Sequence, residues 1–118
     1  MRKLAVSRDG GATFSPYRLA EELVTPPCMA SVIRYDAPSG SSPGTLLHSL
    51  PFGKGRSNGV VFRSLDDGKG WNAVASVQKG GFAYSCLVKL EDGSLGCLYE
   101  TAGYREIRFA VILSLIHI

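Results

Sequence analysis

Short apolar stretches, separated by turn-forming residues, recur along most of the chain. Their alternation predicts strands at residues 4–6, 30–35, 45–48, 60–62, 83–90, 94–100 and 107–113. We expect Asp36 to Gly44 to be a surface loop and Glu91 to Gly93 to be a hairpin loop. Clear helical periodicity is absent, although Arg18 to Val24 fits a short helical turn that Pro26 and Pro27 would end. The pattern therefore predicts an all-β fold of antiparallel strands.

Two of the predicted turns carry the same motif. Ser7 to Phe14 and Ser64 to Trp71 share the frame Ser-x-Asp-x-Gly-x-x-aromatic, and they start 57 residues apart, at positions 7 and 64. An apolar strand enters each motif and an extended stretch leaves it, which indicates a hairpin turn. In such a turn the Asp accepts backbone N–H bonds, Gly supplies positive φ, and the aromatic ring covers the adjacent core. The motif stabilises the chain and does not catalyse.

Repeats of roughly 40 to 60 residues built from short strands are typical of β-propellers. The chain accounts for about two four-stranded blades, whereas a closed propeller needs at least about four. The alternative is that the motifs are two unrelated Asp-Gly turns.

Composition and charge exclude several other classes of protein. The chain has 118 residues, 45% of them hydrophobic, with 14 Gly and 6 Pro, which is a globular composition with many turns. Its longest apolar run, Phe109 to Leu113, is far shorter than the roughly 20 residues of a membrane span. The net charge of +3 includes no contiguous basic run, so we expect no nucleic-acid partner. The N-terminal region lacks the apolar core of a secretory signal, so it does not indicate a compartment.

The two motifs, with several other segments, resemble the exo-sialidases (neuraminidases), whose catalytic domain is a six-bladed propeller carrying such Asp boxes. The segments that carry the resemblance are Ser31–Tyr35, Leu46–Pro51, Gly55–Val60, Tyr84–Ser85 and Gly93–Glu100. Their order and spacing are similar to the last third of that domain. The resemblance implies an all-β partial six-bladed propeller, about its last two blades, with residues 1–112 as the C-terminal portion of the propeller domain.

For Tyr84 the resemblance implies the role of catalytic nucleophile. Sialic acid carries a carboxylate on its anomeric carbon, so a carboxylate nucleophile would be repelled, whereas a phenol arrives neutral. With an ordinary pKa near 10, the phenol needs a neighbouring base, which in this family is a Glu. The alternative is a strand tyrosine that packs half of its ring.

The resemblance also implies roles for two charged residues. Arg56 is similar to the third arginine of a triad that binds the substrate carboxylate, a task that suits the planar guanidinium fork. Arg63 is the rival position, and because it directly precedes the second Asp box we interpret it as a surface strand residue. Glu100 is similar to the acid that holds the first triad arginine in place. The alternatives are a solvated loop arginine for Arg56 and a solvated strand-end carboxylate for Glu100.

The loop between the last two long strands decides whether Tyr84 and Glu100 share a face of the sheet. If residues 91–93 form a three-residue loop with Gly93 in the left-handed region, Tyr84 lies opposite Glu100. A two-residue Asp92-Gly93 turn would instead place Glu100 on the other face. We expect the three-residue loop, because it puts both functional side chains on one surface.

The three cysteines, Cys28, Cys86 and Cys97, have no metal-ligand spacing. We expect free buried thiols, no metal and no cofactor. In the three-residue register Cys86 and Cys97 point to opposite faces, so we expect no disulfide between them.

The family's other catalytic groups, namely two arginines, an acid/base Asp and the Glu that activates the tyrosine, lie upstream of the matching segment. We therefore expect an N-terminally truncated fragment whose Met1 is not the natural start. Residues 113–118 depart from the family's closing strand, and our hypothesis is that this tail is foreign. Alone, the chain is expected to be inactive and poorly stable.

The function implied is that of a fragment of an exo-α-sialidase. This retaining glycoside hydrolase releases terminal sialic acid from sialylated glycoproteins, glycolipids or oligosaccharides. The family suggests a secreted or lysosomal location, which no residue here marks. One alternative is a non-catalytic Asp-box propeller that binds protein or glycan, with Tyr84 and Glu100 in structural roles. Another is a small freestanding β-sandwich.

Overall fold

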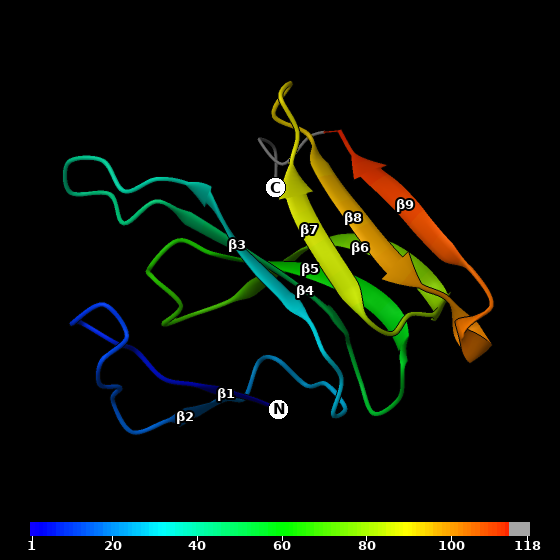
Figure 1. Ribbon diagram of the computed structural model, residues 1–118, viewed down its shortest axis with the longest axis horizontal. Coiled ribbons are helices and arrows are strands. Elements are labelled where there is room, and N and C mark those ends of the chain that lie inside the picture. The colour runs from blue at the N-terminus through cyan, green and yellow to red at the C-terminus, as the bar shows by residue number, and fades with distance from the viewer. Residues whose placement is uncertain (114–118) are drawn as a thin grey trace.

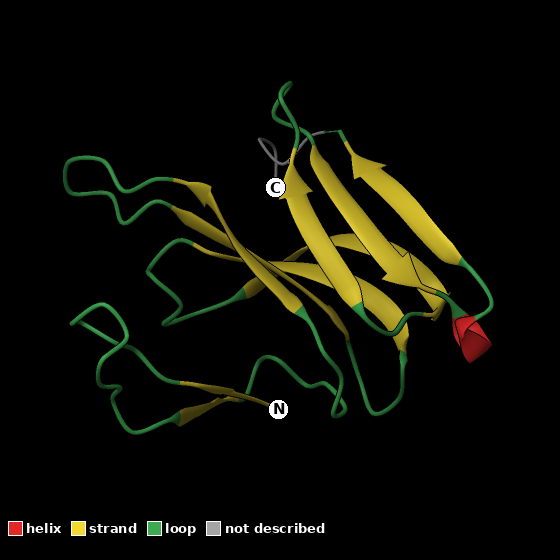
Figure 2. Ribbon diagram, in the orientation of Figure 1, coloured by secondary structure: helices red, strands yellow, loops and turns green. Residues whose placement is uncertain are grey.

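The computed structural model describes residues 1–113, in which nine strands form three antiparallel sheets (Figures 1 and 2). The sheets have the strand orders β1-β2, β3-β4-β5-β6 and β7-β8-β9. The strands are β1 (Arg2–Leu4), β2 (Arg18–Ala20), β3 (Ser31–Asp36), β4 (Thr45–Pro51), β5 (Ser57–Ser64), β6 (Asn72–Gly81), β7 (Ser85–Lys89), β8 (Leu95–Glu100) and β9 (Ile107–Ile112). Within residues 1–113 the only helix is one 3-10 turn, η1 (Ala102–Tyr104). The predicted all-β antiparallel class is confirmed.

The central strands β4 and β5 of the four-stranded sheet are buried on both faces, which explains why the middle of β5 is a continuous apolar run. Val61 packs toward the sheet of β7 to β9, whereas Val60 and Phe62 pack toward β1 and β2. The first core consists of Leu47, Val61, Phe82, Leu87, Leu95, Cys97 and Tyr99, and the second of Ala20, Leu23, Leu50, Val60, Phe62 and Trp71. Successive side chains of a strand point to opposite faces, so one strand serves both cores.

The two Asp boxes form equivalent hairpins. Leu4 pairs with Arg18 between β1 and β2, and Val61 pairs with Ala75 at the same register between β5 and β6. In the first box the Asp9 carboxylate accepts hydrogen bonds from Ser7 Oγ and from the Thr13 N–H. Hydrogen bonds from Thr13 and Ser7 lower the pKa of Asp9 to about 2.

The second box repeats this arrangement, with Asp66 accepting from Ser64 Oγ and from the Gly70 N–H. Its aromatic residue, Trp71, is buried and donates Nε1–H to the Gly68 carbonyl at 3.2 Å. The prediction that the aromatic residue of the motif covers the core is therefore confirmed for Trp71. It is wrong for Phe14, which is 65% exposed.

The hairpin of β7 and β8 has the predicted three-residue loop. Leu90 donates its N–H to the Ser94 carbonyl at 2.9 Å, and Gly93 has a φ of 87°. The register places Ser85 opposite Tyr99, and it continues outward with the Glu100 N–H bonded to the Tyr84 carbonyl at 3.1 Å. Tyr84 and Glu100 therefore occupy facing positions, as predicted.

Three further expectations from the sequence need correction. Arg18 to Val24 is not helical, because pairing with β1 makes residues 18–20 the strand β2, and a turn follows it. Two complete four-stranded units are not present in residues 1–113. The second Asp box joins the last two strands of the four-stranded sheet, and the first box likewise joins β1 and β2, which are the only strands of their sheet in residues 1–113. The third sheet, β7 to β9, has three strands.

The third correction concerns the cysteines. All three are free, and Cys28 and Cys97 are buried as expected, whereas Cys86 is exposed. The register explains the difference, because Cys86 lies on the open face of the sheet formed by β7 to β9 and Cys97 faces the core. In residues 1–113 no helix is long and apolar enough to cross a membrane. The tail predicted at residues 113–118 lies, apart from Leu113, outside the described residues.

Candidate active site

Tyr84 stands just before β7, and Glu100 ends the neighbouring strand β8. The Glu100 carboxylate accepts a hydrogen bond from the Tyr84 backbone N–H at 3.2 Å, in place of the ladder bond that the strands would otherwise make here. The Tyr84 side chain is 42% exposed, and its hydroxyl has no hydrogen-bond partner within residues 1–113. The sheet thus presents a phenol to solvent with a carboxylate at its base.

Arg56 reaches the same place from the connection between β4 and β5. Its guanidinium carbon lies 5.5 Å from the centre of the Tyr84 ring. The backbone explains this proximity, because the Arg56 carbonyl accepts the N–H of Phe82 at 3.0 Å, and Phe82 lies only two residues before Tyr84. The Phe82 ring is fully buried and stacks on Tyr99, which fixes the segment to the core. Arg56 and Tyr84 therefore lie on the same side of the molecule.

Two further groups hold the Arg56 guanidinium. Nη1 donates to the Tyr104 hydroxyl at 2.8 Å, and Nη2 donates to the Pro27 carbonyl at 3.0 Å. The hydrogen bond to Tyr104, and secondarily the nearby Cys28, raise the pKa of Arg56. Sequence reasoning missed Tyr104 and Pro27, since only the folded chain brings residues 27, 56 and 104 together.

Cys28, the residue after Pro27, is buried close to Arg56 and Arg2. Burial raises the pKa of its thiol despite the opposing effect of Arg56 and Arg2. Arg2 donates from Nη2 to the Cys28 carbonyl, and burial lowers the pKa of Arg2. The Cys28 thiol therefore loses its proton less readily than an ordinary cysteine thiol.

Beside Tyr84 and Glu100 there is a shallow, largely apolar pocket of about 230 Å³. Met29, Leu98 and Ile107 contribute its apolar wall. Within residues 1–113 Glu100 forms no ion pair. Tyr84 and Glu100 thus line this pocket, and the Arg56 guanidinium lies beside the Tyr84 ring.

Arg63 occupies a different environment. It lies in β5, where it pairs with Leu47 of β4 and Asn72 of β6, and it is half-buried beside the second Asp box. Because Arg56 and Arg63 stand at opposite ends of β5, only Arg56 lies beside Tyr84.

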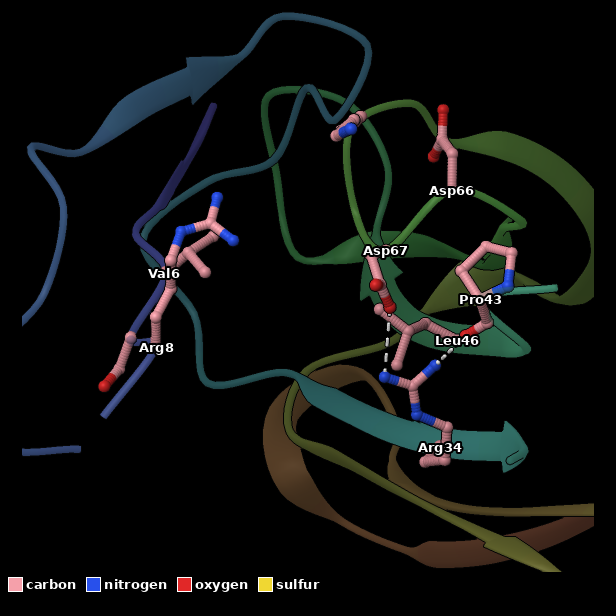
Figure 3. Close-up of a pocket in the computed structure, with 9 residues that line it drawn as sticks. Val6, Arg8, Arg34, Pro43, Leu46, Asp66 and Asp67 are labelled. Carbon is pink, nitrogen blue, oxygen red and sulfur yellow. Dashed lines mark hydrogen bonds and ion pairs between the residues drawn. The ribbon is translucent and has the colours of Figure 1, made fainter. Parts of the chain in front are cut away.

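The Asp-box end of the four-stranded sheet has its own hollow, of about 720 Å³ (Figure 3). Arg34 crosses it, donating to the Pro43 carbonyl at 2.8 Å and pairing with Asp67 at 3.1 Å, while Arg8 stands on the facing loop. The ion pair joins exposed side chains and closes the loop between β3 and β4 onto the second box. This hollow is separated from Tyr84 by the length of β5, and we assign it no catalytic role.

Comparison with known proteins identifies relatives of this chain. No protein-family model matches the chain. A sialidase of Micromonospora viridifaciens is 40% identical over 113 residues, which cover 92% of this chain and 18% of that protein. An anhydrosialidase of Macrobdella decora is 31% identical over 108 residues, which cover 80% of this chain and 14% of that protein. The chain thus spans less than a fifth of the length of either relative.

Comparison with solved structures also finds a sialidase-type protein. The crystal structure of the intramolecular trans-sialidase from Ruminococcus gnavus, in complex with oseltamivir carboxylate, superposes with a TM-score of 0.72 at 28% identity. The superposition covers 93% of this chain and 27% of that one. The three sheets therefore correspond to part of a sialidase-type propeller, and the chain is related in sequence and fold to a segment of the sialidases.

Proposed function

We propose that the full-length protein carrying this chain is an exo-α-sialidase that releases terminal sialic acid from glycoproteins, glycolipids or oligosaccharides. The proposal rests mainly on one observation: Tyr84 lies in contact with both Arg56 and Glu100, although the three residues come from separate segments of the chain. A guanidinium 5.5 Å from a phenol ring suits a substrate whose carboxylate is attached to the reacting carbon. The family relationship supports the same reading over a non-catalytic Asp-box module.

In this proposal Tyr84 is the nucleophile. Its oxygen bonds to the anomeric carbon as the bond to the leaving oxygen breaks, and water later displaces the tyrosine, so that configuration is retained. The phenolic proton passes to a carboxylate base, and the leaving oxygen takes a proton from a carboxylic acid. Both of these groups are assigned to the part of the protein outside this chain.

The two charged residues have separate roles. Arg56 binds the sialic acid carboxylate through two parallel N–H bonds, which a planar guanidinium provides and a lysine does not. Glu100 is a positioning residue that holds an arginine supplied from outside the chain. Its half-buried carboxylate, which has no ion-pair partner within residues 1–113, supports that role.

The test is hydrolysis of a fluorogenic sialoside by the full-length protein and its Tyr84→Phe variant. Loss of the nucleophilic oxygen is expected to lower kcat by at least ~10³-fold. Tyr17→Phe is the matched control, because Tyr17 is also an exposed tyrosine but lies beside Lys3 on the first sheet. Unchanged turnover in Tyr84→Phe would refute the nucleophile, and absence of turnover in the unmodified protein would favour a non-catalytic binding module.

A further inference from the structure

Tyr104 makes an unusual contact for an exposed loop residue. It is 58% exposed, yet its hydroxyl accepts the Nη1–H bond of Arg56 at 2.8 Å. It belongs to η1, the turn between β8 and β9, which begins two residues after Glu100. The same strand that carries Glu100 therefore leads directly into the turn that contacts Arg56.

The backbone of this turn is held in a conformation that a tyrosine rarely adopts. Gly103 and Tyr104 have φ values of 68° and 58°, both in the left-handed region. Such a conformation persists outside glycine only where neighbouring contacts impose it, and it is concentrated at functional sites. Here the Tyr104 N–H is bonded to the Thr101 carbonyl at 3.0 Å, and the Thr101 N–H is bonded to the Glu106 carbonyl at 3.0 Å.

A glycine on the neighbouring sheet lets this turn dock. Gly81, at the end of β6, lies so close to the backbone of Ala102 that a Cβ at position 81 would overlap it. β6 also leads into Phe82, whose N–H is bonded to the Arg56 carbonyl. One segment thus fixes both the backbone of Arg56 and the turn that presents Tyr104.

We propose that Tyr104 is a positioning residue, which presets the Arg56 guanidinium for a carboxylate ligand. This inference rests on the proposed sialidase function of Arg56. A guanidinium has five N–H donors, and Tyr104 and Pro27 each take one from a different terminal nitrogen. One N–H on each terminal nitrogen and the Nε–H then remain for a substrate. The two acceptors lie at opposite ends of the fork, so they fix its plane as well as its position.

Losing the Tyr104 hydroxyl leaves the charge of Arg56 intact and frees its side chain to rotate. Arg56 binds the substrate carboxylate in the ground state and in the transition state alike. Loss of the Tyr104 hydroxyl should therefore weaken the binding of both states equally. KM is therefore expected to rise about 5-fold in Tyr104→Phe, with kcat changed by less than about 2-fold.

The experiment compares the full-length protein with its Tyr104→Phe and Tyr17→Phe variants. The two tyrosines are similarly exposed, at 58% and 60%, and Tyr17 does not contact Arg56. Besides kcat and KM for the fluorogenic sialoside, the inhibition constants of free sialic acid and of its carboxyl methyl ester are measured. Tyr104→Phe should weaken inhibition by the acid about 5-fold and leave inhibition by the ester unchanged, because the ester offers no carboxylate.

The outcomes separate this inference from the proposed function. If the unmodified protein hydrolyses the sialoside and Tyr104→Phe matches it in KM and in acid inhibition, the positioning role is refuted while the function stands. A fall in kcat at unchanged KM would also refute it, since Tyr104 would then act in the transition state. Absence of hydrolysis by the unmodified protein would refute the function itself. In that case an unchanged affinity of Tyr104→Phe for sialic acid, measured by calorimetry, would refute the positioning role independently.

Discussion

A single glycine sets how closely β5 approaches the segment that carries Tyr84. A Cβ at Gly59 would overlap the ring of Phe82, which is fully buried. Phe82 in turn holds the Arg56 carbonyl and leads to Tyr84. At the scale of one residue, the absence of a side chain therefore controls the distance between two groups of the candidate site.

We expect Gly59→Ala to destabilise the full-length protein by roughly 1–3 kcal/mol, because the added methyl overpacks a filled core. Its midpoint of thermal unfolding should fall by several degrees, and turnover should fall with it. Gly55→Ala is the matched control, since a Cβ at Gly55 meets open space and its φ is not positive. Equal melting temperatures for the two variants would contradict this account of Gly59.

At the scale of elements, β4 buries a histidine against the second Asp box. The His48 ring lies edge-on to Trp71 with centroids 5.5 Å apart, and Nδ1 bonds to the Ser31 carbonyl at 2.9 Å. Burial lowers the pKa of His48 to about 4 from its ordinary 6.5. The native protein therefore keeps this ring neutral under conditions in which an unfolded chain protonates it.

This burial predicts a loss of stability in acid. Between about pH 6.5 and pH 4 the unfolded state binds a proton that the folded state does not, so the free energy of unfolding falls as the pH falls. The drop is of the order of 3 kcal/mol, from a pKa difference of about 2.5. Melting temperatures of the full-length protein and of His48→Phe, measured from pH 7 to pH 4, should diverge over this range. Parallel curves would show that His48 titrates normally.

At the scale of the whole molecule, the sheet of β7 to β9 leaves one face uncovered. Exposed apolar side chains line it: Val88 on β7, Leu98 on β8, and Ile107, Phe109 and Val111 on β9. β9 also forms an open sheet edge in residues 1–113, since its only partner there is β8. An apolar face beside an unpaired edge favours association with other chains.

The 118-residue chain by itself is therefore expected to self-associate. Light scattering should show a mass that rises with concentration, and Phe109→Ser should reduce this rise by removing an exposed aromatic ring from the face. Leu65→Ser is the control, because Leu65 is similarly exposed but lies on the second Asp box. A monodisperse monomer for the unmodified chain would contradict the prediction.

The same preparation is expected not to hydrolyse a sialoside, because the Tyr84 hydroxyl has no base within residues 1–113.

Much of the secondary structure followed from the sequence, because strand alternation and turn chemistry are local. The Asp boxes fixed two hairpins through contacts that span only a few residues, such as Asp9 with Thr13. For the loop at residues 91–93 the sequence allowed two lengths, and the structure confirmed the three-residue loop that places Tyr84 and Glu100 at facing positions. By contrast β2 was missed, because its three residues become a strand only by pairing with β1.

The sequence by itself predicted the all-β class and, through family resemblance, proposed Arg56, Tyr84 and Glu100 as site residues, whereas the structure decided between the two hairpin registers that the sequence allowed. Only the tertiary structure decided that Arg56, and not Arg63, lies beside Tyr84, and that Tyr104 and Pro27 hold its guanidinium. The physical reason is sequence separation. These contacts join residues 27, 56, 84 and 104, and packing of whole sheets around buried rings such as Phe82 brings them together, which no local pattern encodes.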